Sequence, residues 1–457
     1  MKLELNKVTI THVLLMYLVL HAFVISFPED WLVFDEGLFS WASRTLLEGE
    51  DRTPYQMPGL HVIGAISISL MGDDWFSLRA PIVVFGLGVL FLFYLISKEF
   101  TSERNALLAT TIFSFDTIFF FHSQLFLRDV PMMFFGFLAI YFYFKKKFYL
   151  AGFLIGVGAL IKETILFMLI FIVIYHIIVE IKNRKNNLDP HKSKLKIPFL
   201  KSGIFCIIVF VSFIIPLWIY DVVVTPIMYE PAIPIRVNAD GTETAYSYPQ
   251  ILVYEKRGYY LQERIGEITN PYEHLKFYFE NGLLSGAYDS SKRNITQNYI
   301  PINWILPIPT DTENGRGGIG MGFKKSQPFD EVKNGWPHKG EELGVDRLGY
   351  PNLGLWPLGF WATISFIGYS FLKRDKSNTA IFLSIGLIAL YGSYLLLDIF
   401  NGRIMMPYYF ILTVPIITLG AVCFMDISKS RVLRYSGKIL ILSTTVAWFV
   451  FYFPVKL

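Results

Sequence analysis

The chain has 457 residues, of which 53% are hydrophobic and only 17% are charged, and its mean hydropathy is +0.44. A soluble domain of this length carries far more charge, so the composition excludes a soluble globular protein and predicts a polytopic membrane protein. The net charge of +4 does not indicate nucleic acid as a partner, because in membrane proteins the placement of Lys and Arg matters more than their sum. Both cysteines, Cys206 and Cys423, lie in apolar runs, which argues against a disulfide framework.

Apolar stretches recur along the whole chain, and a helix needs about 20 such residues to cross a bilayer. We predict an all-α fold with about eleven transmembrane helices. The first stretch follows Lys2 and Lys7 but has no small-residue cleavage site before Pro28, so we expect an anchor rather than a signal peptide. The predicted spans are residues 8–27, 78–97, 105–121, 129–144, 148–161, 163–180, 202–220, 354–372, 379–399, 404–424 and 438–454.

Basic residues predict how these helices are oriented. With a cytoplasmic N-terminus, every loop on the cytoplasmic side carries Lys or Arg, as the positive-inside rule requires. We therefore expect a multi-pass protein of the cell membrane whose N-terminus is cytoplasmic. The basic residues of these loops are Lys98 and Arg104, then Lys145 to Lys147, then Lys182 to Lys201, then Lys373, Arg374 and Lys376, and finally Lys429, Arg431, Arg434 and Lys438.

This topology divides the chain into three parts. Residues 1–220 form an N-terminal transmembrane module, which contains a first external loop at 28–77. A long external loop follows at 221–353, and residues 354–457 form C-terminal transmembrane helices. A loop as long as 221–353 usually has a function or forms a small domain.

The external loops are predicted to carry helices on the membrane surface. The run Gly59 to Met71 is apolar but too short to span a bilayer, so we expect it to lie along the surface. An amphipathic helix through Leu46 precedes it, and Tyr272 to Leu284 predicts a further surface helix in the long loop.

Two adjacent carboxylates, Asp35 and Glu36, lie where the chain first leaves the membrane. Acidic residues favour helix starts, so a simple capping role stays open for this pair. Aromatic and large apolar residues flank the pair, and a partly desolvated carboxylate gains basicity, which suits a general base. The flanking residues are Trp31, Leu32, Val33 and Phe34 before the pair, and Leu38, Phe39 and Trp41 after it.

Cations and acids recur at three other external turns. Arg128 and Asp129 begin one predicted span, Lys162 and Glu163 interrupt an otherwise apolar stretch, and Arg403 begins a later span. Interfacial anchoring, capping or an ordinary hairpin turn would also explain each residue taken alone. Their convergence on one face of the membrane instead predicts a site for an anionic phosphate, with neighbouring carboxylates orienting a sugar hydroxyl or a metal.

These motifs resemble the GT-C class of membrane glycosyltransferases that use polyprenyl-phosphate sugars, especially the dolichyl-phosphate-mannose–protein mannosyltransferases and their prokaryotic and archaeal relatives. The resemblance is best over residues 30–175 and loose after residue 220, apart from Arg403 to Pro407. Many members have His-Pro where this chain has Gln56-Met57, and relatives often place an Arg at Gln124. The matching stretches are Phe34 to Glu36, Tyr55 to Leu60, Gly72 to Arg79, Phe126 to Asp129 and Leu160 to Glu163.

The resemblance implies a GT-C fold and an inverting hexosyltransferase with an external active site. Asp35 would deprotonate the acceptor hydroxyl, and Glu36 would position that hydroxyl or share the role. Arg128, Lys162 and Arg403 would stabilise the charge on the leaving phosphate. The implied partners are membrane lipids, a polyprenyl-phosphate-linked hexose donor, with mannose as the first candidate, and a protein, glycan or lipid acceptor. No cofactor is expected with certainty, a divalent cation is left open, and its ligands are unknown.

Two other classes of function stay open. A transporter or flippase of lipid-linked sugars would carry its ionisable residues near the bilayer midplane on broken helices. In this sequence nearly all such residues lie at the edges of spans, and Asp116 is the main exception. A non-catalytic assembly subunit would tolerate loss of the acids.

Overall fold

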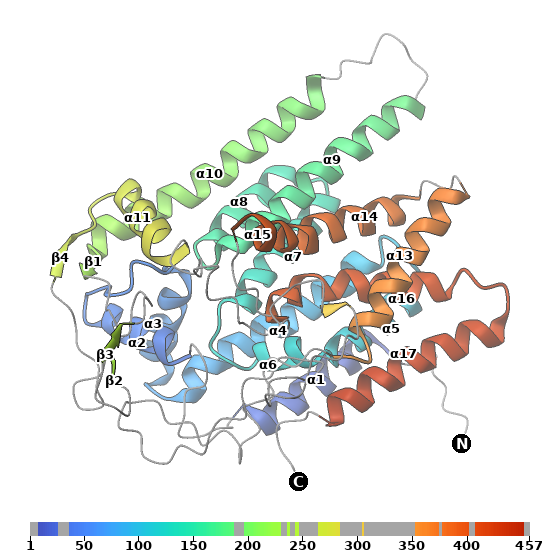
Figure 1. Cartoon of the computed structure of the whole chain (residues 1–457), viewed down its shortest axis with the longest axis horizontal. Helices are drawn as coiled ribbons and strands as arrows, with labels where there is room; N and C mark the ends of the chain where they lie inside the picture. The colour runs from blue at the N-terminus through green and yellow to red at the C-terminus, as the bar shows by residue number, and fades with distance from the viewer. Residues whose placement is uncertain are drawn as a thin grey trace.

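The computed structural model describes residues 8–25, 36–186, 196–229, 235–237, 243–245, 264–283, 304–305, 352–373, 377–401 and 407–451. Helices make up most of these residues, and two short two-stranded sheets complete them (Figure 1). The predicted helical character of the fold is therefore confirmed. Asp35 and Arg403, two of the predicted site residues, lie outside the described residues.

Helices in the N-terminal part begin close to the predicted residues. Helix α7 has the predicted bounds, Asp129–Phe144, and α3 occupies the predicted surface helix, Gly59–Met71. Side chains fix several helix starts; Asp74, for example, accepts a hydrogen bond of 2.7 Å from the Ser77 N–H at the start of α4. The remaining helices are α1 (Ile10–Val24), α2 (Glu36–Leu47), α4 (Trp75–Ser97), α5 (Glu103–Ser114), α6 (Thr117–His122), α8 (Phe148–Ala159), η2 (Glu163–Ile165), α9 (Leu166–Asn186) and α10 (Lys196–Val224).

The predicted span 105–121 is divided into α5 and α6 by Asp116. The Asp116 carboxylate caps α6 by accepting from the Phe119 N–H at 2.9 Å, and it also accepts from Trp356 Nε1 at 2.7 Å. Side-chain hydrogen bonds of this kind compete with the helix ladder and favour a new helix start. Asp116 therefore joins the two halves of the bundle.

The C-terminal part is a second group of apolar helices. The predicted span 379–399 is covered by α14, by a π-helical segment and by α15, which follow one another without a break. The elements are α13 (Trp356–Leu372), α14 (Asn378–Gly386), the π-helix η9 (Leu387–Gly392), α15 (Ser393–Asn401), the 3₁₀ helix η10 (Pro407–Leu412), α16 (Val414–Met425) and α17 (Arg431–Phe451).

Short elements follow the end of α10. Strand β1 (Ile227–Tyr229) pairs antiparallel with β4 (Arg264–Glu267), and β2 (Ile235–Val237) pairs antiparallel with β3 (Glu243–Ala245). The predicted surface helix of the long loop is α11 (Pro271–Tyr278), continued by the π-helical segment η4 (Phe279–Leu283). Figure 1 shows β1, β4 and α11 at the same end of the molecule as α2 and α3.

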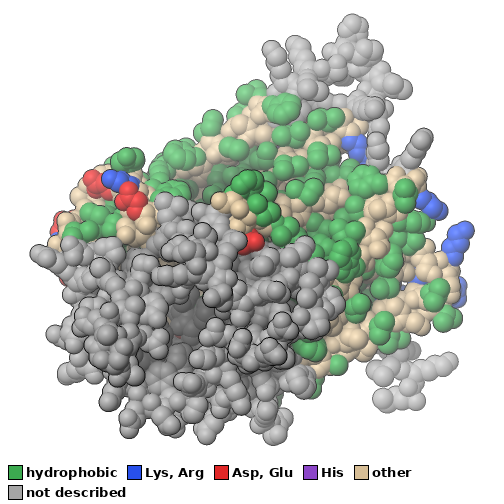
Figure 2. All heavy atoms as spheres, viewed as in Figure 1, with side chains coloured by type: hydrophobic (Ala, Val, Ile, Leu, Met, Phe, Trp, Pro, Cys, Tyr) green, Lys and Arg blue, Asp and Glu red, His purple; other side chains and the backbone are tan. Residues whose placement is uncertain are grey.

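Four helices in the described part of the chain are long and apolar enough to cross a membrane: Trp75–Ser97, Glu163–Asn183, Phe199–Val224 and Asn378–Phe400. Shorter apolar helices accompany them, among them α1, α7, α8 and α16. Hydrophobic side chains cover much of the visible helical body in Figure 2. These features support an integral multi-pass protein, while the number of about eleven spans stays a prediction.

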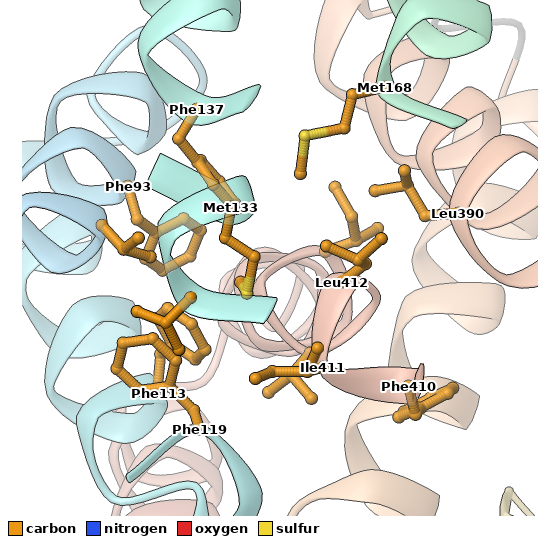
Figure 3. Close-up of a cluster of buried hydrophobic side chains, with 14 of the residues drawn as sticks. Phe93, Phe113, Phe119, Met133, Phe137, Met168, Leu390, Phe410, Ile411 and Leu412 are labelled. Atoms are coloured by element: carbon orange, nitrogen blue, oxygen red, sulfur yellow. The ribbon is translucent and has the colours of Figure 1, made fainter. Parts of the chain in front are cut away.

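The core lies between the N-terminal and C-terminal groups of helices. Figure 3 shows Phe93 and Met133 on one side of it and Met168 and Leu390 on the other, with Ile411 between. Leu390 lies in η9 and Met168 in α9, so the packing joins residues far apart in the sequence. Burial of this aromatic and aliphatic surface holds the turns at the bundle ends in place.

The basic turns gather at one end of the bundle. Lys145, after α7, contacts Glu99, after α4, at 3.1 Å. Lys182 near the end of α9 donates to Asn378 at the start of α14 at 2.9 Å. These contacts place the ends of α4, α7 and α9 and the start of α14 together, away from the residues described next.

Candidate active site

The predicted site residues come from three separate elements. Glu36 is the first residue of α2, Asp129 is the first residue of α7, and Glu163 begins η2. Arg128 and Lys162 directly precede the last two. All five lie at helix ends, as the sequence predicts for a site at a membrane surface.

Glu36 is held by Arg79, the fifth residue of α4. The Glu36 Oε1 atom lies 3.0 Å from Arg79 Nε, and Oε2 lies 2.9 Å from Nη2, so the contact is bidentate. Both side chains have 0% exposure. Glu36 Oε1 also accepts from the Phe126 N–H at 2.8 Å, and Arg79 Nη1 donates to the Ile25 carbonyl at 3.2 Å. Glu36 thus joins α2 to α4 and to the turn before α7.

These contacts bear on the role of Glu36. A carboxylate with both oxygens bound to a buried guanidinium is held in one orientation and is poorly suited to accept a proton from substrate. The geometry therefore favours positioning over proton abstraction for Glu36. Asp35, the residue directly before Glu36, lies outside the described residues.

Asp129 and Lys162 form a buried ion pair. Lys162 Nζ lies 2.6 Å from Asp129 Oδ1, and the two side chains are 6% and 9% exposed. His122 Nδ1 lies 3.6 Å from the other oxygen, Oδ2. The ammonium also lies 5.1 Å from the ring centroid of Tyr409 and 5.9 Å from that of Tyr408. The charge of Lys162 is therefore already balanced within the protein.

Arg128 connects this pair to α2. Its guanidinium carbon lies 5.1 Å from the ring centroid of Phe39. Arg128 Nη1 is buried and has no hydrogen-bond partner among the described residues. Arg128 interacts electrostatically with Glu163, whose carboxylate is also hydrogen-bonded by the Tyr278 hydroxyl. Arg128 therefore keeps an N–H donor free for an anion, whereas the Lys162 ammonium is already paired with Asp129.

The start of α3 packs directly on the turn that carries Lys162. The Gly59 N–H donates to the Leu160 carbonyl at 2.7 Å. A Cβ atom at Gly59 would lie 2.7 Å from the same carbonyl oxygen, a distance that real Cβ atoms do not reach. Only glycine therefore permits this approach, which brings α3 against the turn between α8 and η2.

A second group of buried polar residues adjoins Arg128, and the sequence did not indicate it. Asp51 Oδ2 accepts from the Tyr220 hydroxyl at 2.8 Å, and His274 Nδ1 lies 2.6 Å from Asp221 Oδ1. His61 interacts with Asp51, Arg128 and His274, and its burial lowers its pKa to about 4, with Asp51 opposing that shift. These His and Asp residues occur singly in separate segments of the chain and form no motif, so no sequence pattern pointed to them.

A metal site is not evident in the described part of the chain. No three or more His, Cys, Asp and Glu residues there are grouped so that they could hold a metal ion. A requirement for a divalent cation therefore stays untested.

Comparisons with known proteins bear on the family likeness and the fold of this chain. Residues 54–216 match the family model described as dolichyl-phosphate-mannose-protein mannosyltransferase. This match includes Arg79 and the turns of Arg128 and Lys162 but not Glu36. In the solved structure of the S. cerevisiae protein O-mannosyltransferase Pmt1–Pmt2 complex bound to the sugar donor, one chain superposes with a TM-score of 0.60 at 13% identity, covering 97% of this chain and 89% of that one.

Over residues 54–216 the chain is similar to this mannosyltransferase family, and its fold is similar to that of the yeast O-mannosyltransferase. The predicted resemblance is thereby confirmed, and the likeness to the yeast protein, at 13% identity, establishes the fold. A search of curated protein sequences gives no match. The roles of individual residues in this mannosyltransferase-like chain rest on its own geometry.

Proposed function

We propose that this protein is a membrane hexosyltransferase that takes its sugar, mannose being the first candidate, from a polyprenyl phosphate. The family match and the shared fold support a glycosyltransferase that uses a dolichyl-phosphate sugar donor. The observation that carries the proposal is the meeting of acids and cations at one bundle end: Glu36 contacts the Phe126 N–H, and Arg128 lies against Phe39 of α2.

In the proposed reaction Asp35 removes a proton from the acceptor hydroxyl, whose oxygen attacks the anomeric carbon of the donor sugar. The bond between that carbon and the phosphate oxygen breaks, and the configuration inverts. The polyprenyl phosphate leaves with an additional negative charge, which Arg128 stabilises with its free donor and Arg403 with its own guanidinium. Glu36, fixed by Arg79, positions the loop.

Two features support a site on the external face. The described Lys145 and Lys182 contacts lie at the opposite end of the bundle from Glu36 and Asp129. Basic turns tend to lie on the cytoplasmic side of a membrane, so Glu36 and Asp129 would lie on the external side. Nucleotide sugars stay in the cytosol, and a lipid-carried donor fits an external site. Protein, glycan and lipid acceptors all remain compatible with the site.

The experiment that tests this function is sugar transfer by purified protein from a panel of labelled polyprenyl-phosphate hexoses. We expect transfer from one donor, with the product of inverted configuration. Transfer from nucleotide sugars alone, or from none of the lipid donors, would contradict the proposal.

The flippase hypothesis gains no support from the described residues. Its main sequence feature was Asp116, which caps α6 and binds Trp356, a structural arrangement. The other charged site residues that the structure describes lie at helix starts rather than within broken spans. An assay in proteoliposomes with donor supplied only on the outer face separates the two functions, because a transferase needs no translocation.

A further inference from the structure

Glu163 has one carboxylate oxygen engaged and one without a partner. The Tyr278 hydroxyl hydrogen-bonds this carboxylate, and Arg128 and Lys162 interact with it electrostatically. Its Oε2 atom is buried and has no hydrogen-bond partner among the described residues. Leaving a buried polar atom unpaired destabilises the folded protein, so such an atom calls for an explanation. An ionised carboxylate can only accept, and hydroxyl groups are its natural donors.

Tyr278 reaches Glu163 from α11, the helix of the long loop. His274 lies one turn earlier on the same helix face, and it is paired with Asp221 near the end of α10 at 2.6 Å. Both side chains of that pair have 0% exposure. The two contacts on one face attach α11 to α10 and to the turn of Glu163 together.

Helix α11 is also held at its start and on its other side. Asn270 accepts from the Glu273 N–H at 3.1 Å, while Glu273 accepts from the Thr269 N–H at 3.1 Å, which forms a reciprocal cap. Phe277 packs in a small buried cluster with Tyr55 of the first external loop and Ile268. A helix fixed in this way can hold a hydroxyl group at a defined position.

We propose that Glu163 binds a hydroxyl group of the donor sugar through Oε2, and that Tyr278 is the positioning residue that sets its orientation. This inference rests on the proposed function and deepens it, because it names the residue that recognises the sugar. The cations beside Glu163 belong to the phosphate side of the donor, and the sugar is attached to that phosphate. The free oxygen therefore lies within the region that the sugar must occupy. The long loop contributes to sugar selection through α11.

Donors that lack single hydroxyl groups test the assignment of Glu163. A buried acceptor left without its hydroxyl penalises the deoxy analogue, so we expect the wild-type protein to lose about tenfold or more in kcat/KM for one deoxy-hexosyl donor. In Glu163→Ala the parent and that deoxy donor should differ by less than about threefold, because the acceptor is gone. Glu163→Gln, which keeps an acceptor oxygen, should retain part of the discrimination. An unchanged ratio in Glu163→Ala would overturn the assignment.

Tyr278→Phe tests the positioning role, because it removes one hydroxyl and keeps the ring. We expect donor KM to rise about tenfold or more with little change in kcat, and discrimination between the parent and deoxy donors to weaken. Tyr272→Phe is the matched control, since Tyr272 lies on the same helix and is 76% exposed. Thermal unfolding of each variant shows whether the fold is retained.

The outcomes separate the two proposals. If the wild-type protein transfers sugar but Tyr278→Phe behaves like Tyr272→Phe, the positioning role is wrong and the proposed function stands. If the wild-type protein transfers from no polyprenyl-phosphate sugar, the proposed function is contradicted and the inference falls with it.

Discussion

The carboxylate of Glu36 and the guanidinium of Arg79 form a bidentate ion pair, at 3.0 and 2.9 Å, with neither side chain exposed. The pair connects α2 to α4, and the Phe126 N–H extends it to the turn before α7. A buried pair of this kind fixes geometry more surely than it adds stability.

Removing one member of this pair should destabilise the protein strongly. Arg79→Met leaves the Glu36 carboxylate buried without its guanidinium, so we expect the free energy of unfolding to fall by about 3–5 kcal/mol. Unfolding of the purified protein in lipid nanodiscs measures this change. Arg44→Met is the control, because the Arg44–Asp73 pair is exposed and should contribute no more than about 1 kcal/mol. Equal losses in the two variants would contradict a structural role for the buried pair.

Loss of the proposed base should affect chemistry and spare the fold. Asp35→Asn should lower kcat for sugar transfer about a hundredfold or more, the usual contribution of a general base, while leaving donor binding and thermal unfolding unchanged. Glu48→Gln, at an exposed position of the same loop, is the control. Turnover close to wild type in Asp35→Asn would rule out Asp35 as the base.

Loss of a phosphate-binding cation should weaken donor binding. Arg128→Met and Arg403→Met should each cost about 1.5–3 kcal/mol in affinity for a polyprenyl phosphate, the size of a charge-assisted hydrogen bond. Binding isotherms with the lipid phosphate alone measure this cost. Lys276→Met, an exposed position on α11, should bind normally. If Arg128→Met also binds the lipid phosphate normally, Arg128 Nη1 does not bind the phosphate in the wild-type protein.

Replacement of Lys162 should affect both donor use and stability. Lys162→Met should weaken donor use less than Arg128→Met does, because Asp129 already balances the Lys162 charge, and it also leaves Asp129 buried without its partner at 2.6 Å. We expect the second effect to be partly reversed in the double variant Lys162→Met/Asp129→Asn, because that variant removes the unpaired charge. If the loss of unfolding free energy in the double variant equals the sum of the losses in the two single variants, Lys162 and Asp129 are not coupled.

Cysteine labelling tests the orientation of the chain. In a background of Cys206→Ser/Cys423→Ser, cysteines in place of Glu48 and Tyr272 should react with a membrane-impermeant reagent added outside. A cysteine in place of Lys147 should react only after the membrane is permeabilised. The reverse pattern would place the site on the cytoplasmic face and remove the reason for a lipid-carried donor.

Parts of the candidate site followed from the sequence, and others did not. Charged residues at the ends of apolar stretches are conspicuous, so Arg128, Asp129, Lys162 and Glu163 were identified directly. The sequence did not show that Lys162 is neutralised by Asp129 while Arg128 keeps a free donor, because these differences depend on packing between separate turns. Tyr278 and His274 carried no signal, since a single aromatic residue and a single histidine in a predicted surface helix form no motif.

The sequence by itself determined several helices of this protein. A run of apolar residues is a local property, and it set α7 to Asp129–Phe144 and α3 to Gly59–Met71 without reference to the rest of the chain. The tertiary structure alone decided which charges meet. Glu36 and Arg79 are 43 residues apart, and their pairing depends on how α2 and α4 pack. Such contacts are selected by the burial of whole helix faces, which no local pattern of residues encodes.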